Sequence, residues 1–235
     1  MNQVIESLMR THLPGLTEEQ YARLGLYAER LEETNRKFNL TSLVAPEEIV
    51  LLHFYDALSL LRTGLFVPGA SVVDVGTGAG VPAYPLAVCT ECAVTALDAT
   101  VKKLDFLASA AREAGLTSLK TLSGRAEELG KGAPWRESFD VAVSRGVARM
   151  NVLCEWCLPF VKPGGRFVAM KGTGGREELE EAKNALKTLG GELLSVTDVP
   201  IPETGRTHTL IVVAKTRPTD PKYPRPNGRI MKKPL

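Results

Sequence analysis

The sequence predicts an α/β protein with a mostly parallel seven-stranded sheet, an antiparallel last strand and a helical N-terminal extension. Three observations lead to this fold class. From about residue 70 onward, short β-branched runs alternate with longer segments of helical periodicity, as in βαβ units. A glycine-rich turn follows the first of these runs. No long helix separates the last two runs, which indicates an antiparallel hairpin at the end of the sheet.

Two helical segments precede the alternation. Residues 17–38 begin with Thr17 as an N-cap, and their apolar residues recur at spacings of three and four. Residues 47–64 follow Pro46, which is typical of a helix start, and end at Gly64, which is typical of a helix end. We therefore expect a helical extension over residues 1–64.

The alternation itself predicts seven strands and five helices. The expected strands are 70–76, 93–98, 119–124, 139–146, 166–172, 191–201 and 208–215, and the expected helices are 81–88, 101–115, 125–130, 148–161 and 175–190. We assign residues 65–216 to one domain. Residues 217–235 form a Pro-, Lys- and Arg-rich tail, which we expect to lack regular structure by itself.

Composition and charge limit the classes of function that the chain can have. With 44% hydrophobic residues the chain can form a core, and no apolar run reaches the roughly 18 residues of a membrane helix. The N-terminus lacks the apolar region of a secretory signal, so we expect a cytoplasmic protein. The net charge is +2, but residues 215–235 carry +6 and the remainder −4. This asymmetry favours a tail that faces nucleic acid, and a solvated terminus is the alternative.

Four cysteines form two CxxC pairs, Cys89 with Cys92 and Cys154 with Cys157. The pairs are about 60 residues apart, whereas the pairs of a four-cysteine zinc site are about 15 to 20 apart. We therefore expect buried thiols and no metal. Cys154 and Cys157 should share one buried helix face, with Trp156 in the core between them.

The stretch VVDVGTGAGVPAYPLA carries the first functional signal. Its glycines, Gly76, Gly78 and Gly80, do not match the dinucleotide pattern GxGxxG, which needs a glycine where Val81 stands. A Walker phosphate loop is also absent from the sequence. The remaining interpretation is a turn at the carboxyl end of the first strand where the backbone passes close to a ligand. An acid before such a turn, here Asp74, is typical of S-adenosylmethionine (SAM) sites, where it can hold the ammonium group or a water.

Two further acids follow in register with this turn. Asp98 ends the second strand, where a carboxylate can accept hydrogen bonds from a ribose diol, although the same spacing suits NAD. After the third strand, Ala126 and Glu127 could read adenine, or Glu127 could be a first-turn helix acid. The three features together favour a SAM site.

Ordered blocks now link the chain to a known family. They are NLTSL (39–43), HFYDALSL (53–60), DVGTGAGVPAYPLAV (74–88), LDATVKKLDFL (97–107), GRAEEL (124–129), SRGVA (144–148), GGRFVAMKG (164–172) and the ending KYPRPNGRIMKKPL. From about Asn39 onward the sequence resembles the bacterial guanine-N7 methyltransferases of small-subunit ribosomal RNA, once named glucose-inhibited division protein B. The resemblance implies a Rossmann-like class I SAM-dependent methyltransferase fold. It also implies methyl transfer from SAM to N7 of a guanine in 16S rRNA.

The resemblance also implies a set of site residues. The cofactor would contact Gly76, Gly78, Gly80, Val81, Asp98, Thr100, Ala126, Glu127 and Arg145. The family usually has Phe or Leu where Val81 stands, and Ser-Leu where Ala99 and Thr100 stand. Because guanine N7 has a lone pair and no proton, the reaction needs orientation and water exclusion, and no general base.

Three residues are candidates for the reaction centre. Arg145 would contact cofactor or RNA, or else only cap the turn that follows its strand. Lys171 would position a phosphate or base. Asn39 would present its amide to the target base, or else cap the loop. His53, beside Asp56, is expected to be a structural histidine.

We expect a monomer that binds 16S rRNA or the small subunit through the tail and a basic rim of the cofactor mouth. The rim candidates are Arg62, Lys102, Lys103, Arg145, Arg149 and Lys171. Two alternatives remain open: a SAM methyltransferase for a non-RNA substrate, and a non-catalytic RNA-binding module with a vestigial cofactor turn.

Overall fold

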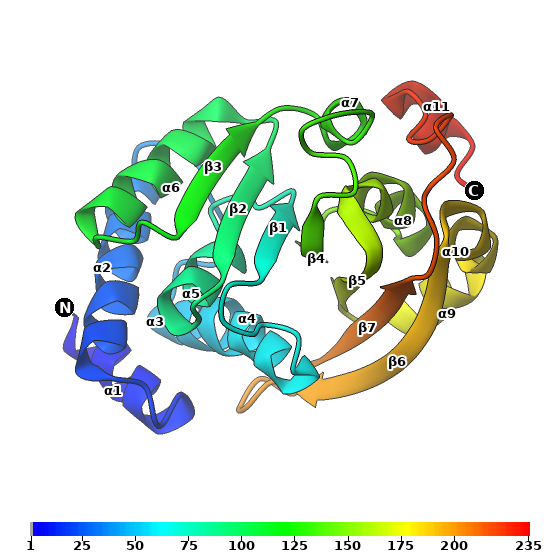
Figure 1. Ribbon diagram of the computed structural model, residues 1–235. Coiled ribbons are helices and arrows are strands. Elements are labelled where there is room, and N and C mark those ends of the chain that lie inside the picture. Colours follow the sequence, from blue (N-terminus) through cyan, green and yellow to red (C-terminus); the bar gives the residue numbers. More distant parts are fainter. Residues whose placement is uncertain (1) are drawn as a thin grey trace.

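A seven-stranded sheet is the centre of the computed structural model, which describes residues 2–235 (Figure 1). Its strand order is β3-β2-β1-β4-β5-β7-β6. The strands are β1 (Ser71–Val75), β2 (Ala93–Asp98), β3 (Leu119–Ser123), β4 (Phe139–Arg145), β5 (Val161–Lys171), β6 (Gly191–Pro200) and β7 (Thr207–Lys215). Strands β1 to β5 pair in parallel, and β7 is antiparallel to both β5 and β6. The predicted mixed sheet with an antiparallel last strand is confirmed.

Helices cover both faces of this sheet. They include α5 (Ala83–Cys89), α6 (Val101–Glu113), α7 (Ala126–Leu129), α8 (Met150–Cys157), α9 (Gly175–Glu181) and α10 (Lys183–Leu189), with the short turn η3 (Leu158–Phe160). Successive strand residues point to opposite faces and enter different hydrophobic clusters: Val72 packs with α5 and α6, and Val73 with α8. The predicted helix 175–190 is two helices, interrupted at Ala182, where the sequence has no glycine or proline.

The N-terminal extension packs against the α5–α6 face. It consists of α1 (Gln3–His12), α2 (Glu18–Asn35), α3 (Pro46–Glu48), η1 (Ile49–Tyr55), α4 (Asp56–Leu58) and η2 (Ser59–Thr63). Thr17 and Gln20 form a capping box at α2, and Gly64 ends η2 with φ +69°, as expected. Helix α1 was not predicted from the sequence, although Ile5 and Met9 are spaced by four and both are buried.

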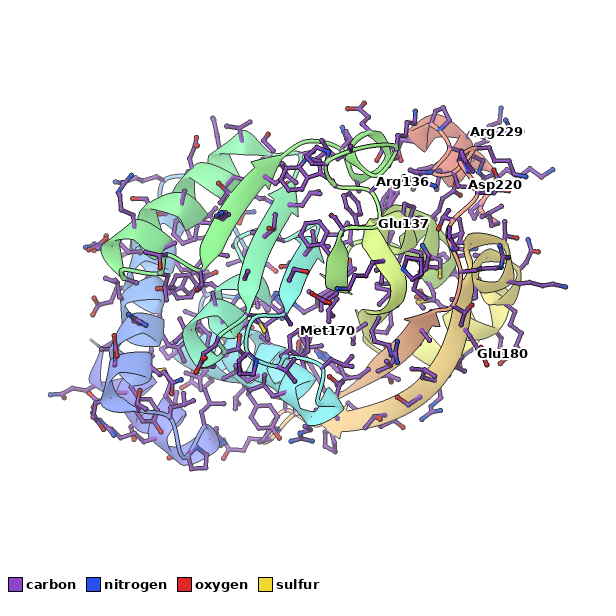
Figure 2. All side chains as sticks on the ribbon, viewed as in Figure 1. Arg136, Glu137, Met170, Glu180, Asp220 and Arg229 are labelled. Atoms are coloured by element: carbon purple, nitrogen blue, oxygen red, sulfur yellow. The ribbon has the colours of Figure 1, made fainter. Side chains whose placement is uncertain are left out.

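The C-terminal tail contains a helix and packs against the domain; the expectation that it lacks regular structure by itself stays a prediction. Residues 227–232 form helix α11 (Asn227–Lys232), which contacts α8. Arg225 donates to Glu155, whose side chain is fully buried, and Arg136 donates to the carbonyls of Thr219 and Tyr223. Figure 2 shows Arg136 beside the segment that carries Asp220 and Arg229. Short helices form readily when such tertiary contacts stabilise them.

Within residues 2–235, no helix combines the length and the apolar character that crossing a membrane requires.

Candidate active site

The glycine-rich turn after β1 takes backbone conformations that favour glycine. Gly76, Gly78 and Gly80 have φ values of +77°, +60° and +104°. A Cβ atom added at Gly76 would lie 2.6 Å from Cγ2 of Val147, whereas one added at Gly78 would meet nothing within 4 Å. Gly76 therefore allows close packing against the β4–α8 loop, and Gly78 leaves open space above the turn.

Asp98, at the end of β2, fixes this turn from the side. One carboxylate oxygen accepts a hydrogen bond from the Gly78 backbone N–H at 2.9 Å, and the other accepts from the Thr100 N–H at 2.8 Å. Thr100 is the N-cap residue of α6. The expected ribose acid thus also joins the glycine turn to the start of α6, a second role that the spacing alone did not reveal.

Two adjoining clefts lie around the turn. The first, of about 240 Å³ and here called the Glu127 cleft, is lined by Val75, Gly76, Leu97, Asp98, Ala99, Thr100, Gly124, Arg125, Ala126, Glu127, Val147 and Trp156. The second, of about 330 Å³ and here called the Arg145 cleft, is lined by Leu40, Thr41, His53, Gly76, Thr77, Gly78, Ala79, Val81, Asp98, Lys103, Arg145, Gly146 and Val147. Gly76, Asp98 and Val147 line both. Together the clefts bring the expected cofactor-contacting residues to one region, apart from Gly80, which is in the same turn.

Arg145 lies at the end of β4, and helix η1 and its continuation hold its guanidinium. The guanidinium donates to the Leu52 carbonyl and to Asp56 Oδ2 at 3.1 Å, and it contacts His53 Nδ1 at 3.1 Å. Asp56 is fully buried, and its other oxygen contacts His208 Nδ1 at 2.8 Å. The N-terminal extension therefore fixes Arg145 at the edge of the cleft and places a negative charge against its positive charge.

These contacts define the protonation state of His53. Burial is the main cause that lowers the pKa of His53 to about 3, and the neighbouring Arg145 lowers it further. The imidazole is therefore neutral at physiological pH. A guanidinium can only donate, so Nδ1 is the accepting nitrogen and Nε2 carries the proton. The expected structural role for His53 agrees with this contact to Arg145.

Asp74 and Thr77 carry buried polar atoms that lack partners. Asp74 Oδ2 accepts from the Ala83 N–H at 3.2 Å, while Asp74 Oδ1 and Thr77 Oγ1 make no hydrogen bond of ordinary geometry in the described chain. Burial raises the pKa of Asp74 to about 6. The Thr77 hydroxyl is nevertheless near enough to Asp74 to lower the pKa of its carboxyl in part. Unpaired acceptors beside an open glycine turn fit a ligand that brings hydrogen-bond donors, such as the ammonium group of SAM.

Two predicted residues lie outside both clefts. Lys171 is buried, and its ammonium pairs with Glu178 at 2.7 Å and donates to the Ala148 carbonyl at 2.8 Å. Asn39 is exposed, and its neighbours Leu40 and Thr41 line the Arg145 cleft in its place. The backbone N–H groups of these two neighbours both donate to Asn35, which the sequence reading did not single out. The roles of Lys171 and Asn39 in the reaction remain predictions.

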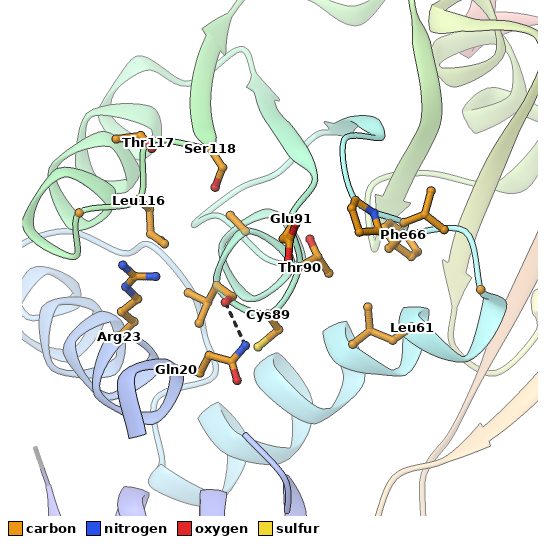
Figure 3. A pocket seen from close by; sticks show the side chains of 16 residues that line it. Gln20, Arg23, Leu61, Phe66, Cys89, Thr90, Glu91, Leu116, Thr117 and Ser118 are labelled. Carbon is orange, nitrogen blue, oxygen red and sulfur yellow. Dashed lines mark hydrogen bonds between the residues drawn. The ribbon is translucent and has the colours of Figure 1, made fainter. Parts of the chain in front are cut away.

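A larger cavity is remote from this chemistry. It measures about 800 Å³ and is lined by α2, α5 and the segments before β1 and β3, with Arg23, Cys89 and Glu91 among its residues (Figure 3). It contains no predicted site residue.

Cys154 and Cys157 are fully buried in α8, and burial raises the pKa of both thiols. Among residues 2–235, no three metal-ligating side chains cluster.

Comparisons with known proteins agree with this architecture. The family model GidB, described as rRNA small subunit methyltransferase G, matches residues 20–206. "Ribosomal RNA small subunit methyltransferase G" of Clostridium perfringens (strain 13 / Type A) is 43% identical over 219 residues, which cover 93% of this chain and 92% of that protein. The protein of the same name from Clostridium botulinum (strain Eklund 17B / Type B) is 41% identical, with coverage of 94% and 92%.

Comparison with a solved structure supports the fold and nothing beyond the fold. The putative S-adenosyl-L-methionine-dependent methyltransferase of Methanococcus maripaludis superposes with a TM-score of 0.54 at 17% identity and covers 81% of this chain and 92% of its own. The match confirms the Rossmann-like methyltransferase fold that the resemblance implied. From the family model and the two relatives we conclude that this chain belongs to the GidB family of small-subunit rRNA methyltransferases.

Proposed function

We propose that the protein transfers a methyl group from SAM to N7 of a guanine in 16S rRNA, and that it does so in the cytoplasm. The observation that carries the proposal is the pair of adjoining clefts around the open Gly78 turn, in a chain of this family. The Glu127 cleft offers a place for the adenosine part of the donor. The Arg145 cleft offers a place for its methionyl part and for the acceptor base, so that donor and acceptor meet at the Gly78 turn.

The two clefts would hold different parts of the cofactor. Adenine would occupy the Glu127 cleft, beside Ala126 and Glu127, and the ribose hydroxyls would donate to Asp98. The methionyl part would lie over Gly78, where the unpaired Asp74 and Thr77 oxygens can accept from its ammonium group. When bound, SAM supplies an activated methyl group on a sulfonium.

The Arg145 cleft would receive the guanine. N7 attacks with its own lone pair, so the protein needs only to hold the base in line and keep water out. Positive charge moves onto the base during the transfer, so an unbalanced cation nearby would oppose it. Asp56 balances the charge of Arg145, and His53 is neutral, so these two groups meet this electrostatic requirement. Lys103 is a further cation in the lining, together with the carboxylate of Asp98.

The tail and the rim offer cations for the RNA backbone, but not every basic residue is available. Lys215 and Arg225 are engaged with Glu137 and Glu155, and Arg62 donates to Tyr55. Lys222 is exposed but pairs with Asp220 at 3.1 Å. Arg229, Lys232 and Lys233 are exposed, and we assign RNA contacts to these three.

The direct test combines radiolabelled SAM with unmethylated small-subunit rRNA and with small subunits. We expect label on one guanine, released by chemistry specific for N7-methylguanine. Label on another base alone, or no label with folded protein, would reject the proposal.

The cofactor part has its own prediction. Asp98→Ala should weaken binding of S-adenosylhomocysteine by about 1–3 kcal/mol, because charge-assisted hydrogen bonds to the ribose are lost. Calorimetry measures this directly. Asp105→Ala, an exposed aspartate on α6, is the matched control and should bind as the wild type does. Equal affinity of both variants would place the ribose elsewhere.

A further inference from the structure

Trp156 occupies a position that its sequence context did not indicate. It lies between two fully buried cysteines on α8, which suggests a core residue, yet it is only half-buried and lines the Glu127 cleft. Its indole Nε1 is itself buried and has no hydrogen-bond partner within residues 2–235. Buried indole N–H groups usually find a partner, so an unpaired one beside a cleft indicates a missing acceptor.

The composition of the cleft indicates what that acceptor belongs to. Val75, Leu97 and Val147 provide apolar walls, Glu127 provides a carboxylate acceptor, and Trp156 provides a donor. A flat purine that carries both an amino donor and ring-nitrogen acceptors complements this set. Adenine has both, with an exocyclic amino group for Glu127 and ring nitrogens for an indole N–H.

The turn of α8 that carries Trp156 is anchored through its neighbour Glu155. Glu155 is fully buried, and the Arg225 backbone N–H and guanidinium donate to it at 2.6–3.1 Å. The C-terminal tail therefore anchors this turn of α8 from the side. A wall fixed before the ligand arrives loses little entropy on binding, which favours affinity.

We propose that Trp156 is a cofactor-binding residue: its indole forms a wall of the adenine subsite, and its N–H donates to a ring nitrogen of adenine. The inference rests on the proposed function, because it assumes that the Glu127 cleft holds the adenosine of SAM.

The chain's two tryptophans provide a matched experiment. Trp135 stacks on Phe139 and does not line the cleft, so Trp135→Phe is the control for Trp156→Phe. Each variant is titrated with S-adenosylhomocysteine by tryptophan fluorescence and by calorimetry. We expect W135F to keep both the affinity and the fluorescence change, and W156F to lose the fluorescence change and bind about tenfold more weakly.

Analogues of S-adenosylhomocysteine that lack one adenine ring nitrogen test the hydrogen bond itself. One analogue should bind wild-type protein about tenfold more weakly than the parent compound, and W156F should not discriminate against it. If each analogue loses affinity by the same factor in wild-type protein and in W156F, the assigned hydrogen bond from the indole N–H is wrong.

The remaining outcomes are distinguishable. W156F with wild-type affinity, or a fluorescence change that disappears in W135F, would overturn the inference while leaving the proposed function intact. Wild-type protein that binds no S-adenosylhomocysteine would overturn both. If W156F does not fold, the W135F titration still decides, because Trp156 is then the sole indole in the chain.

Discussion

Asp74 illustrates, at the scale of one residue, how burial couples a side chain to pH. The pKa of this carboxyl is about 6 in the folded protein, above its ordinary value of 3.8. The folded state therefore holds the proton more tightly than the unfolded state between these two values. The resulting contribution to stability is present below pH 3.8 and is lost as the pH rises through 6, at most about 3 kcal/mol.

Asp74→Asn removes this titration and keeps an acceptor for the Ala83 N–H. We expect the wild type to lose stability relative to D74N between pH 4 and pH 7, by up to about 3 kcal/mol. Urea unfolding at several pH values measures the difference. The exposed Asp105→Asn is the control, and a D74N curve parallel to the wild type would contradict the expectation.

The second prediction at this scale concerns Gly76. Gly76→Ala should cost the strain of a positive φ, about 1–2 kcal/mol, plus the cost of a methyl group pressed against Val147. Gly64→Ala has a similar φ, +69° against +77°, with nothing within 4 Å of the added Cβ, so it isolates the backbone cost. G76A should be the less stable of the two in urea, and Val147→Ala should recover part of the difference.

At the scale of the element, the positions of some helices and strands could be predicted from the sequence and those of others could not. Strand β3 is largely exposed, and β5 begins at Val161 and not at the expected residue 166. Strands β1, β4 and β7 are mostly buried apolar runs between clear turn signals, so periodicity located them well. The glycine turn and Asp98 were found for the same reason, because parallel strands bring their carboxyl ends to one edge. The division of 175–190 into α9 and α10 left no signal in glycine or proline.

Contacts between distant elements could not be predicted. Arg145 is bonded to residues 89 to 93 positions earlier, and Glu155 to one 70 positions later. Local patterns carry no information on such pairs. The sequence therefore located Arg145 but not the Asp56 and His53 contacts that fix it, and it assigned Trp156 to the core.

The link between the tail and α8 gives the element-scale prediction. Arg225→Ala removes the guanidinium and leaves the buried Glu155 charge with only the backbone N–H of residue 225, which should cost about 3 kcal/mol of unfolding free energy. Arg229→Ala, on the exposed side of the same tail, should cost less than about 0.5 kcal/mol. The double variant Glu155→Leu, Arg225→Met should recover most of the loss, because it removes both charges together. A single R225A variant as stable as R229A would show that the pair does not anchor the tail.

At the scale of the whole molecule, positive charge is concentrated at the C-terminal end of the chain. The fold determines which of these basic side chains lie in ion pairs and which are exposed. Residues 215–235 carry +6, but Lys215 and Arg225 lie in ion pairs with Glu137 and Glu155. Deleting the tail would therefore remove structural contacts as well as RNA contacts. Substitution of exposed residues alone separates the two effects.

Lys232→Gln with Lys233→Gln should weaken rRNA binding without affecting stability, because both side chains are exposed. Each lost phosphate contact should reduce the slope of log affinity against log salt by about 0.7 to 0.9. Filter binding of 16S rRNA at several salt concentrations measures the slope, and calorimetry with S-adenosylhomocysteine should show unchanged cofactor affinity. Lys183→Gln, an exposed lysine outside the tail, is the control and should leave the slope unchanged. An unchanged slope in the double variant would mean that the RNA backbone contacts another face. Lys102 and Lys103 of the rim would then be the next candidates.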